Sequence, residues 1–176
     1  LNHVAVEPTT EGGDHYDPLS QTVRLSESHM SARSLTAVAV ATHEVGHAIQ
    51  HAQGHKLLEL RTRLASFSVT IQKIASEALF IAPVIVLLSR SPVAGALLVA
   101  LSVVSFFSAV LIHQVTLPVE LDASFGKAMP ILREGYIEPA DEKAVESILR
   151  AAAYTYVAAS AASLLNAWRW LRMARH

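Results

Sequence analysis

The sequence contains no cysteine and few charged residues, and each shortage excludes a class of protein or site. Without cysteine, the chain can form neither a disulfide nor a thiolate metal site, and its fold suits any redox compartment. Charged residues make up 16% of the chain and nearly cancel, so a net charge of −1 gives no reason to expect a nucleic-acid partner. Hydrophobic residues make up 52% of the 176 residues and the mean hydropathy is +0.36, which is more apolar than a typical soluble domain.

Charge is missing altogether from one long stretch. Val93 to Ile112 is 20 residues long, enough for a helix to cross a bilayer core of about 30 Å at about 1.5 Å per residue. Ile71 to Leu88 is also mostly apolar, although it suits a buried helical hairpin equally well. Ala151 to Leu171 is rich in Ala and Ser, as in membrane helices that pack closely. These stretches predict about three transmembrane helices.

The motif with the clearest chemistry is His43-Glu44-Val45-Gly46-His47. Residues four apart share one face of a helix, so the two histidines can direct their imidazoles at one metal ion. The glutamate is angled away from that ion and can take a proton from water, as in the H-E-x-x-H pattern of zinc hydrolases. We expect this helix to begin between residues 31 and 34, where a serine can cap it, and to end at Gly54.

The first 30 residues differ from the rest of the chain in their pattern of residues, which favours strands and turns. Two strand candidates, at residues 4–6 and 22–26, are separated by a segment rich in turn-forming residues. We expect them to form a small antiparallel sheet beside the motif helix. His15 and Tyr16 fall in the expected loop and are candidates for stabilising an oxyanion.

A hydrolytic zinc site needs three protein ligands and one position open to water. Two membrane crossings after the motif helix would bring the chain back to the side it left, so Glu120 would return to the face of His43 and His47. Asp122 is the competing acid, but two residues on a helix lie about 200° apart, so only one of the pair can face the ion. Pro118 is expected to start or kink a helix at this point.

Two further histidines, His51 and His55, extend the row at four-residue spacing. His51 lies about 12 Å along the helix from His43, at about 1.5 Å per residue, which is too far for one ion to bind both. We therefore expect these two histidines to lie on the surface or to contact the ligands from outside.

Four segments of the chain carry a resemblance to a known family: residues 14–18, 22–27, 43–50 and 117–120, with 151–157 also fitting. Together they resemble the YugP-type neutral zinc metallopeptidases of bacterial membranes. The resemblance covers nearly the whole chain and implies a membrane-embedded, zincin-like peptidase that uses Zn²⁺ and has no assigned natural substrate. Members of that family usually begin with a further membrane helix, so we expect a segment to precede Leu1.

Related zincins with a glutamate ligand often place an aspartate four residues after it, where it orients a histidine ligand. Here Ser124 occupies that position and Asp122 is offset, so the partner of His43 stays open. Gln50 and Gln53 replace the glycine and third histidine of the longer H-E-x-x-H-x-x-G-x-x-H pattern, which excludes that class.

The sequence thus predicts a mainly α membrane protein in which a zincin-like half-domain, a small β-sheet plus the motif helix, is joined to membrane helices. Residues 1–63 would form the half-domain and 64–176 the membrane part, with 117–150 completing the metal site. In this hypothesis His43, His47 and Glu120 bind Zn²⁺ and Glu44 is the catalytic base.

The expected partners are a peptide or protein substrate, added as another strand along 23–25, and the lipid bilayer. The resemblance implies a protein of the bacterial plasma membrane, and basic residues beside the first apolar stretch favour a cytoplasmic catalytic side. Two alternatives stay open: a non-hydrolytic metal-binding transporter or sensor, and an inert membrane scaffold. The sequence does not predict the oligomeric state.

Overall fold

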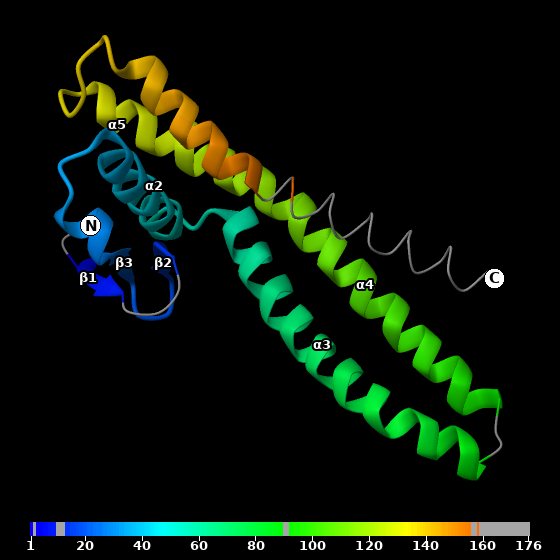
Figure 1. The fold of residues 1–176 in the computed structure, drawn as a ribbon. Helices are drawn as coiled ribbons and strands as arrows, with labels where there is room; N and C mark the ends of the chain where they lie inside the picture. The colour runs from blue at the N-terminus through cyan, green and yellow to red at the C-terminus, as the bar shows by residue number, and fades with distance from the viewer. Residues whose placement is uncertain (2, 10–12, 90–91, 156–157, 159–176) are drawn as a thin grey trace. The chain divides into compact units, whose positions relative to one another are not determined.

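The computed structural model describes residues 1–176 with the exception of 2, 10–12, 90–91, 156–157 and 159–176 (Figure 1). The described chain is mostly helical with one small sheet, as predicted. In chain order the elements are β1 (Ala5–Thr9), β2 (His15–Asp17), β3 (Thr22–Ser26), α1 (Glu27–Ser31), α2 (Leu35–Ala52), α3 (Lys56–Ser89), α4 (Pro92–Leu121), the π-helix η1 (Asp122–Ala128), α5 (Met129–Arg133) and a further helix over 142–155.

The sheet has the order β1-β3-β2, with β3 in the centre. β3 pairs antiparallel with β2 and parallel with β1, so the expected antiparallel pairing of the first and last strands is wrong. The reason is that His15 and Tyr16, expected in a loop, form the short strand β2. The chain therefore reverses twice between β1 and β3 and returns in its original direction. Val23 and Leu25 of β3 are buried.

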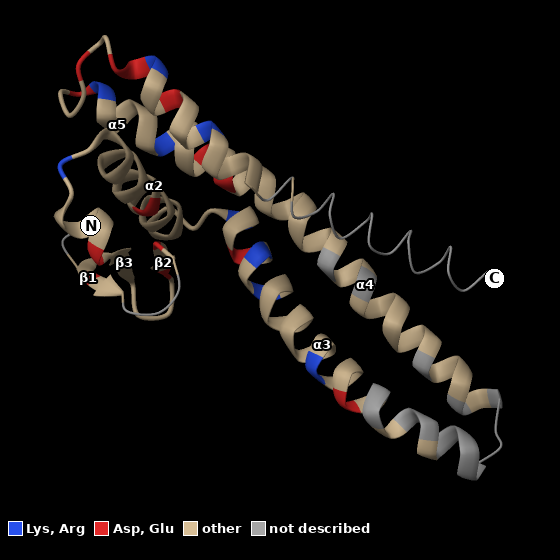
Figure 2. Cartoon of the chain, viewed as in Figure 1, with Lys and Arg blue, Asp and Glu red and all other residues tan. Residues whose placement is uncertain are grey.

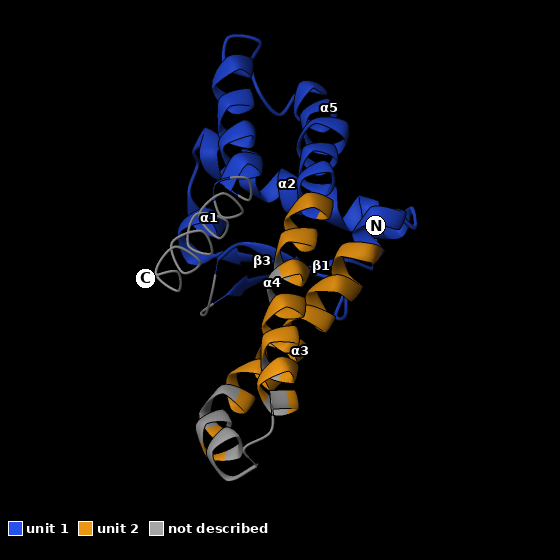
Figure 3. Cartoon of the chain, turned by 90° about the vertical axis from the view of Figure 1, so that its right-hand side faces the viewer, with its two compact units in different colours: residues 1–59, 116–158 blue, residues 60–115, 159–176 orange. Residues whose placement is uncertain are grey.

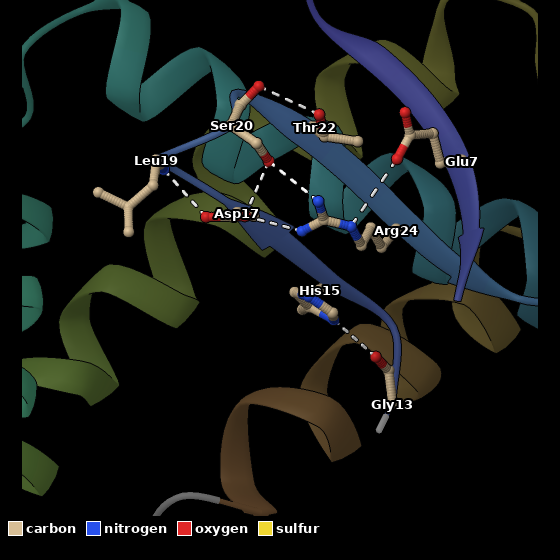
Figure 4. Close-up of polar contacts among 8 residues, drawn as sticks. All are labelled: Glu7, Gly13, His15, Asp17, Leu19, Ser20, Thr22 and Arg24. Carbon is tan, nitrogen blue, oxygen red and sulfur yellow. Dashed lines mark hydrogen bonds and ion pairs between the residues drawn. The ribbon is translucent and has the colours of Figure 1, made fainter. Parts of the chain in front are cut away.

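Arg24 of β3 connects the three strands on one face of the sheet (Figure 4). Its Nη1 donates to Asp17 Oδ2 of β2 at 2.7 Å, and its Nε lies 3.9 Å from the Glu7 carboxylate of β1. Asp17 also accepts hydrogen bonds from the Leu19 amide and the Ser20 hydroxyl in the turn that follows. The Arg24 guanidinium first, and then these turn donors, hold the pKa of Asp17 well below its ordinary value.

The motif helix α2 runs from Leu35 to Ala52, within the predicted bounds. The Ser34 hydroxyl accepts a hydrogen bond from the Ala37 amide at 3.2 Å, which caps the first turn. Gly54, just beyond the last turn, has φ +64°, the left-handed conformation that favours glycine at a helix end. The inner face of α2 packs in a core with η1, α5 and the helix over 142–155. This core is built from Ala39, Ala128, Met129, Leu132, Val145 and Leu149.

The chain divides into two compact units, residues 1–59 with 116–158 and residues 60–115 with 159–176 (Figure 3). The first unit contains the sheet, α2, η1 and α5. Within the second unit, α3 and α4 are joined by a hydrogen bond between the buried Ser68 and Ser108 hydroxyls at 3.2 Å. Gln72 donates a further hydrogen bond to Ser68 at 2.9 Å. Polar groups that are buried between two apolar helices thus satisfy one another.

One described helix is long and apolar enough to cross a membrane, the continuous run from Gly95 to Arg133. It carries no Lys, Arg, Asp or Glu before Glu120 (Figure 2). The prediction of about three membrane helices is not supported. The first predicted stretch, inside α3, contains Lys73 and Glu77, and most of the third stretch lies outside the described residues.

Asp17→Asn should destabilise the protein near pH 7, and the difference from wild type should shrink as the pH falls. The folded state lowers the pKa of Asp17 below the unfolded value of about 3.9. The contribution of the Asp17–Arg24 pair is therefore fully present above that pH and is lost as the pH falls toward the folded pKa. Thermal unfolding in detergent at pH 7 and pH 3 measures this. The exposed Glu138→Gln is the control, and an equal loss at both pH values would contradict the prediction.

Candidate metal centre

The three side chains predicted to bind metal lie together within the first unit. His43 and His47 come from α2, and Glu120 comes from the last turn of α4. One ligand atom from each lies within 4.8 Å of the others. Glu120 Oε2 is 3.1 Å from His43 Nε2 and 3.4 Å from His47 Nε2. Two imidazoles and one carboxylate are a common ligand set of hydrolytic zinc sites, and all three side chains are buried.

A glycine inside the motif allows these helices to approach. A Cβ atom placed on Gly46 would lie 2.6 Å from the carbonyl oxygen of Ala123, closer than side-chain carbons come in proteins. α2 therefore contacts the backbone of η1 directly at this point. η1 is a π-helix, a form that occurs mostly as single turns within α-helices and is frequent at functional sites. Pro118, expected to start or kink a helix, lies inside α4 just before this π-helix.

Gln50 determines which nitrogen of His47 carries the proton. The Gln50 amide nitrogen lies 2.9 Å from the Val119 carbonyl and 2.8 Å from Asp122 Oδ2, and both of these groups are acceptors. Its amide oxygen must therefore be the atom that faces His47 Nδ1, at 3.0 Å. An oxygen can only accept, so His47 Nδ1 is protonated and the Nε2 lone pair points to the metal position.

Ser124 plays the matching part for the other histidine. Its hydroxyl lies 3.0 Å from His43 Nδ1, and both side chains are buried. A proton on His43 Nδ1, donated to this hydroxyl, leaves Nε2 free to bind metal. The question that the sequence left open, which residue orients His43, is thus answered by the position four residues after Glu120. Sequence reasoning missed Gln50, although its three-residue spacing from His47 places both on one helix face.

These contacts show that the residues fit a zinc ion. The Nε2 atoms of both imidazoles lie beside the same Glu120 carboxylate oxygen, so one ion could bind all three side chains. The outer nitrogens are held by Ser124 and Gln50, which is the second layer of contacts that zinc-binding histidines have in proteins.

Glu44 lies beside the cluster and is 7% exposed. Burial raises the pKa of its carboxyl group, and nearby Glu120 adds to the rise. The two motif histidines and a hydrogen bond from the Tyr16 backbone amide oppose it, but the pKa remains above its ordinary value. A buried carboxylate of increased basicity, next to three ligand side chains, is suited to accept a proton.

The remaining histidine and acid candidates lie outside the cluster of ligand atoms. His51 Nδ1 is 2.8 Å from the Tyr16 hydroxyl, and His55 Nε2 is 3.8 Å from Asp122 Oδ2. Asp122 therefore contacts Gln50 and His55, whereas Glu120 lies with the motif histidines. His15, the other oxyanion candidate, is exposed and bonds to the Gly13 carbonyl.

Gln50→Leu should weaken zinc binding by about 10–100-fold, the usual effect of removing a residue that orients a ligand. The substitution removes the acceptor for His47 Nδ1–H and leaves the Val119 carbonyl without its amide donor. Competition with a chromogenic chelator measures the zinc dissociation constant of the purified protein. Gln53→Leu, at an exposed position three residues on, is the matched control. Equal affinities of the two variants would refute this role.

Comparison with known proteins agrees with this geometry. The family model described as "Putative neutral zinc metallopeptidase" matches residues 1–175. "Putative membrane protease YugP" of Bacillus subtilis (strain 168) is 39% identical over 173 residues, which cover 97% of this chain and 73% of that protein. No solved structure matches the chain. Since the family model extends over nearly every residue and the Bacillus relative matches 97% of the chain, the protein belongs to the neutral zinc metallopeptidase family.

Proposed function

We propose that this protein is a membrane-embedded zinc metallopeptidase that hydrolyses peptide bonds. The observation that carries the proposal is the buried convergence of His43, His47 and Glu120, with Glu44 beside them. His43, Glu44 and Glu120 also line a cavity of about 250 Å³, which gives a substrate room to reach them. Family membership supports zinc as the metal.

Each residue has a distinct role in this reaction. His43, His47 and Glu120 would hold a zinc ion, and that ion would act as a Lewis acid that polarises the scissile carbonyl and makes water more acidic. Glu44 accepts a proton from the attacking water while the water oxygen forms its bond to the carbonyl carbon. Glu44 then donates that proton to the leaving amine as the C–N bond breaks, so the carboxylate is regenerated.

The substrate strand cannot lie where the sequence placed it. Residues 23–25 belong to β3, and both edges of β3 are already paired, with β1 and β2. β2 is an edge strand, and the backbone amide of its Tyr16 reaches Glu44. We therefore assign the peptide to the β2 edge, where main-chain hydrogen bonds would align it with the catalytic base.

The membrane setting rests on two findings. The Bacillus relative is named a membrane protease, and the run from Gly95 to Arg133 is long and apolar enough to span a bilayer. We place the protein in the bacterial plasma membrane. Lys56, Arg61 and Arg63 in the first turns of α3 favour a cytoplasmic catalytic side.

Glu44→Gln should retain the fold and the zinc but lower kcat by about 10²–10⁴-fold, the usual contribution of a positioned proton acceptor. Cleavage of denatured casein in detergent measures activity, and elemental analysis measures zinc. The exposed Glu138→Gln controls for loss of one carboxylate. Undiminished turnover in Glu44→Gln would exclude this mechanism, and stoichiometric zinc in a wild type without peptidase activity would favour a non-hydrolytic metal-binding protein.

Glu120→Ala should reduce zinc affinity more than Asp122→Ala does. Glu120 contributes an atom to the ligand cluster, whereas Asp122 acts only through Gln50. The zinc retained after dialysis against graded concentrations of a chelator compares the two variants directly. The reverse order of affinities would show that Asp122, not Glu120, is the carboxylate ligand.

A further inference from the structure

We propose that the cavity beside the metal centre is a specificity pocket, which takes one apolar side chain next to the scissile bond and disfavours acidic ones. The inference rests on the proposed peptidase function and adds the class of substrate. It comes from the part of the cavity lining that takes no part in zinc binding or proton transfer. Four of these residues are apolar, and Asp14 and Thr155 are polar; the apolar ones are Val40, Ile148, Leu149 and Ala152.

The apolar wall has two sides, contributed by helices distant in the sequence. Val40 of α2 lies one turn before Glu44 and therefore on the same helix face as the proposed base. Ile148, Leu149 and Ala152 come from the helix over 142–155, and their spacings of three and four residues place them on one face of that helix. An apolar side chain that enters between them would exchange water for contact with aliphatic carbon.

The size of the cavity indicates what it holds. Its volume of about 250 Å³ is below the range of about 300–1,000 Å³ that is usual for sites of whole small molecules. The space therefore fits one amino-acid side chain better than a cofactor. Ala152 has the smallest side chain of the lining residues and is half-buried.

The charges around the cavity are of one sign. Asp14, Glu44 and Glu120 line it, and no Lys or Arg occurs among the described lining residues. The two positive charges of a zinc ion would offset the negative charges of two of these carboxylates and leave one negative charge at the cavity. Burial by itself would raise the pKa of Asp14, but hydrogen bonds from the Ser26 amide and His29 outweigh it, so the pKa is lowered. An acidic substrate side chain would meet like charge here, whereas an apolar one would not.

The test begins with the wild-type protein loaded with zinc in detergent. Cleavage sites in denatured casein are mapped by mass spectrometry, and one cleaved peptide is remade with Leu, Gly or Asp at each residue flanking the scissile bond. At one of these two positions, kcat/KM for Leu should exceed that for Gly and for Asp by at least about 10-fold. That is the smallest usual effect of one methylene group in an apolar pocket.

Two variants connect this preference to the cavity. Ala152→Phe should fill it and lower kcat/KM for the Leu peptide by at least about 10-fold more than for the Gly peptide, with zinc content and melting temperature unchanged. Ala151→Phe, exposed on the same helix and outside the lining, is the matched control. Val40→Ala should enlarge the cavity and shift the preference from Leu toward Phe, and it replaces Ala152→Phe as the test if that variant fails to fold.

The outcomes separate the pocket from the function. Equal cleavage of the Leu, Gly and Asp peptides by wild type would overturn the pocket and leave the peptidase function standing. A parallel loss for all three peptides in Ala152→Phe, with zinc retained, would do the same. Failure of zinc-loaded wild type to cleave any peptide would overturn both proposals.

Discussion

The direct contact between α2 and η1 is the constraint on which the metal centre depends. Gly46 has no side chain where Ala123 presents its carbonyl, so the two backbones approach more closely than any other residue would permit. The residues that contact the Nδ1 atoms of the two motif histidines depend on this interface for their position. Ser124 reaches His43 from η1, and Gln50 reaches from α2 to Val119 and Asp122. A wider separation would lengthen these three hydrogen bonds together, since each joins α2 to η1 or to the end of α4 and each now has an ordinary length of 2.8 to 3.0 Å.

The interface is polar although it is buried, and this couples metal binding to folding. Gln50, Glu120 and Ser124 are almost completely inaccessible to water. Burial of such groups is unfavourable unless hydrogen bonds or a metal ion compensate, and a buried carboxylate is the most costly of them. A cation bound at Glu120 would offset its charge where solvent cannot. The free energy of zinc binding would therefore stabilise the α2–η1 contact as well as assemble the site.

Local patterns in the sequence predicted what depends on local interactions. Ser34 and Gly54 marked the ends of the motif helix because capping and a positive φ are properties of single positions. The strand β2 was missed because three residues carry too little alternation to distinguish a strand from a loop. The wrong prediction that β1 and β3 pair antiparallel followed from that omission. Ser124 and Gln50 could not be assigned from the sequence alone, since their partners lie across an interface whose geometry depends on tertiary packing.

The position of Glu120 beside the motif histidines depends on the long-range course of the chain. Its partner His43 is 77 residues away in the sequence, and no local pattern connects them. The link was topological: two long apolar helices that run in succession return the chain to the side it left. In the structure the chain between His43 and Glu120 forms α3 and α4, which the buried Ser68–Ser108 hydrogen bond joins within their own unit. Of the two predicted crossings, only the run from Gly95 to Arg133 is long and apolar enough to span a membrane, among the described residues. A paired helical connection nevertheless replaces what would otherwise be a long flexible loop, whose closure costs conformational entropy. In the proposed site, this connection brings Glu120 to the two motif histidines.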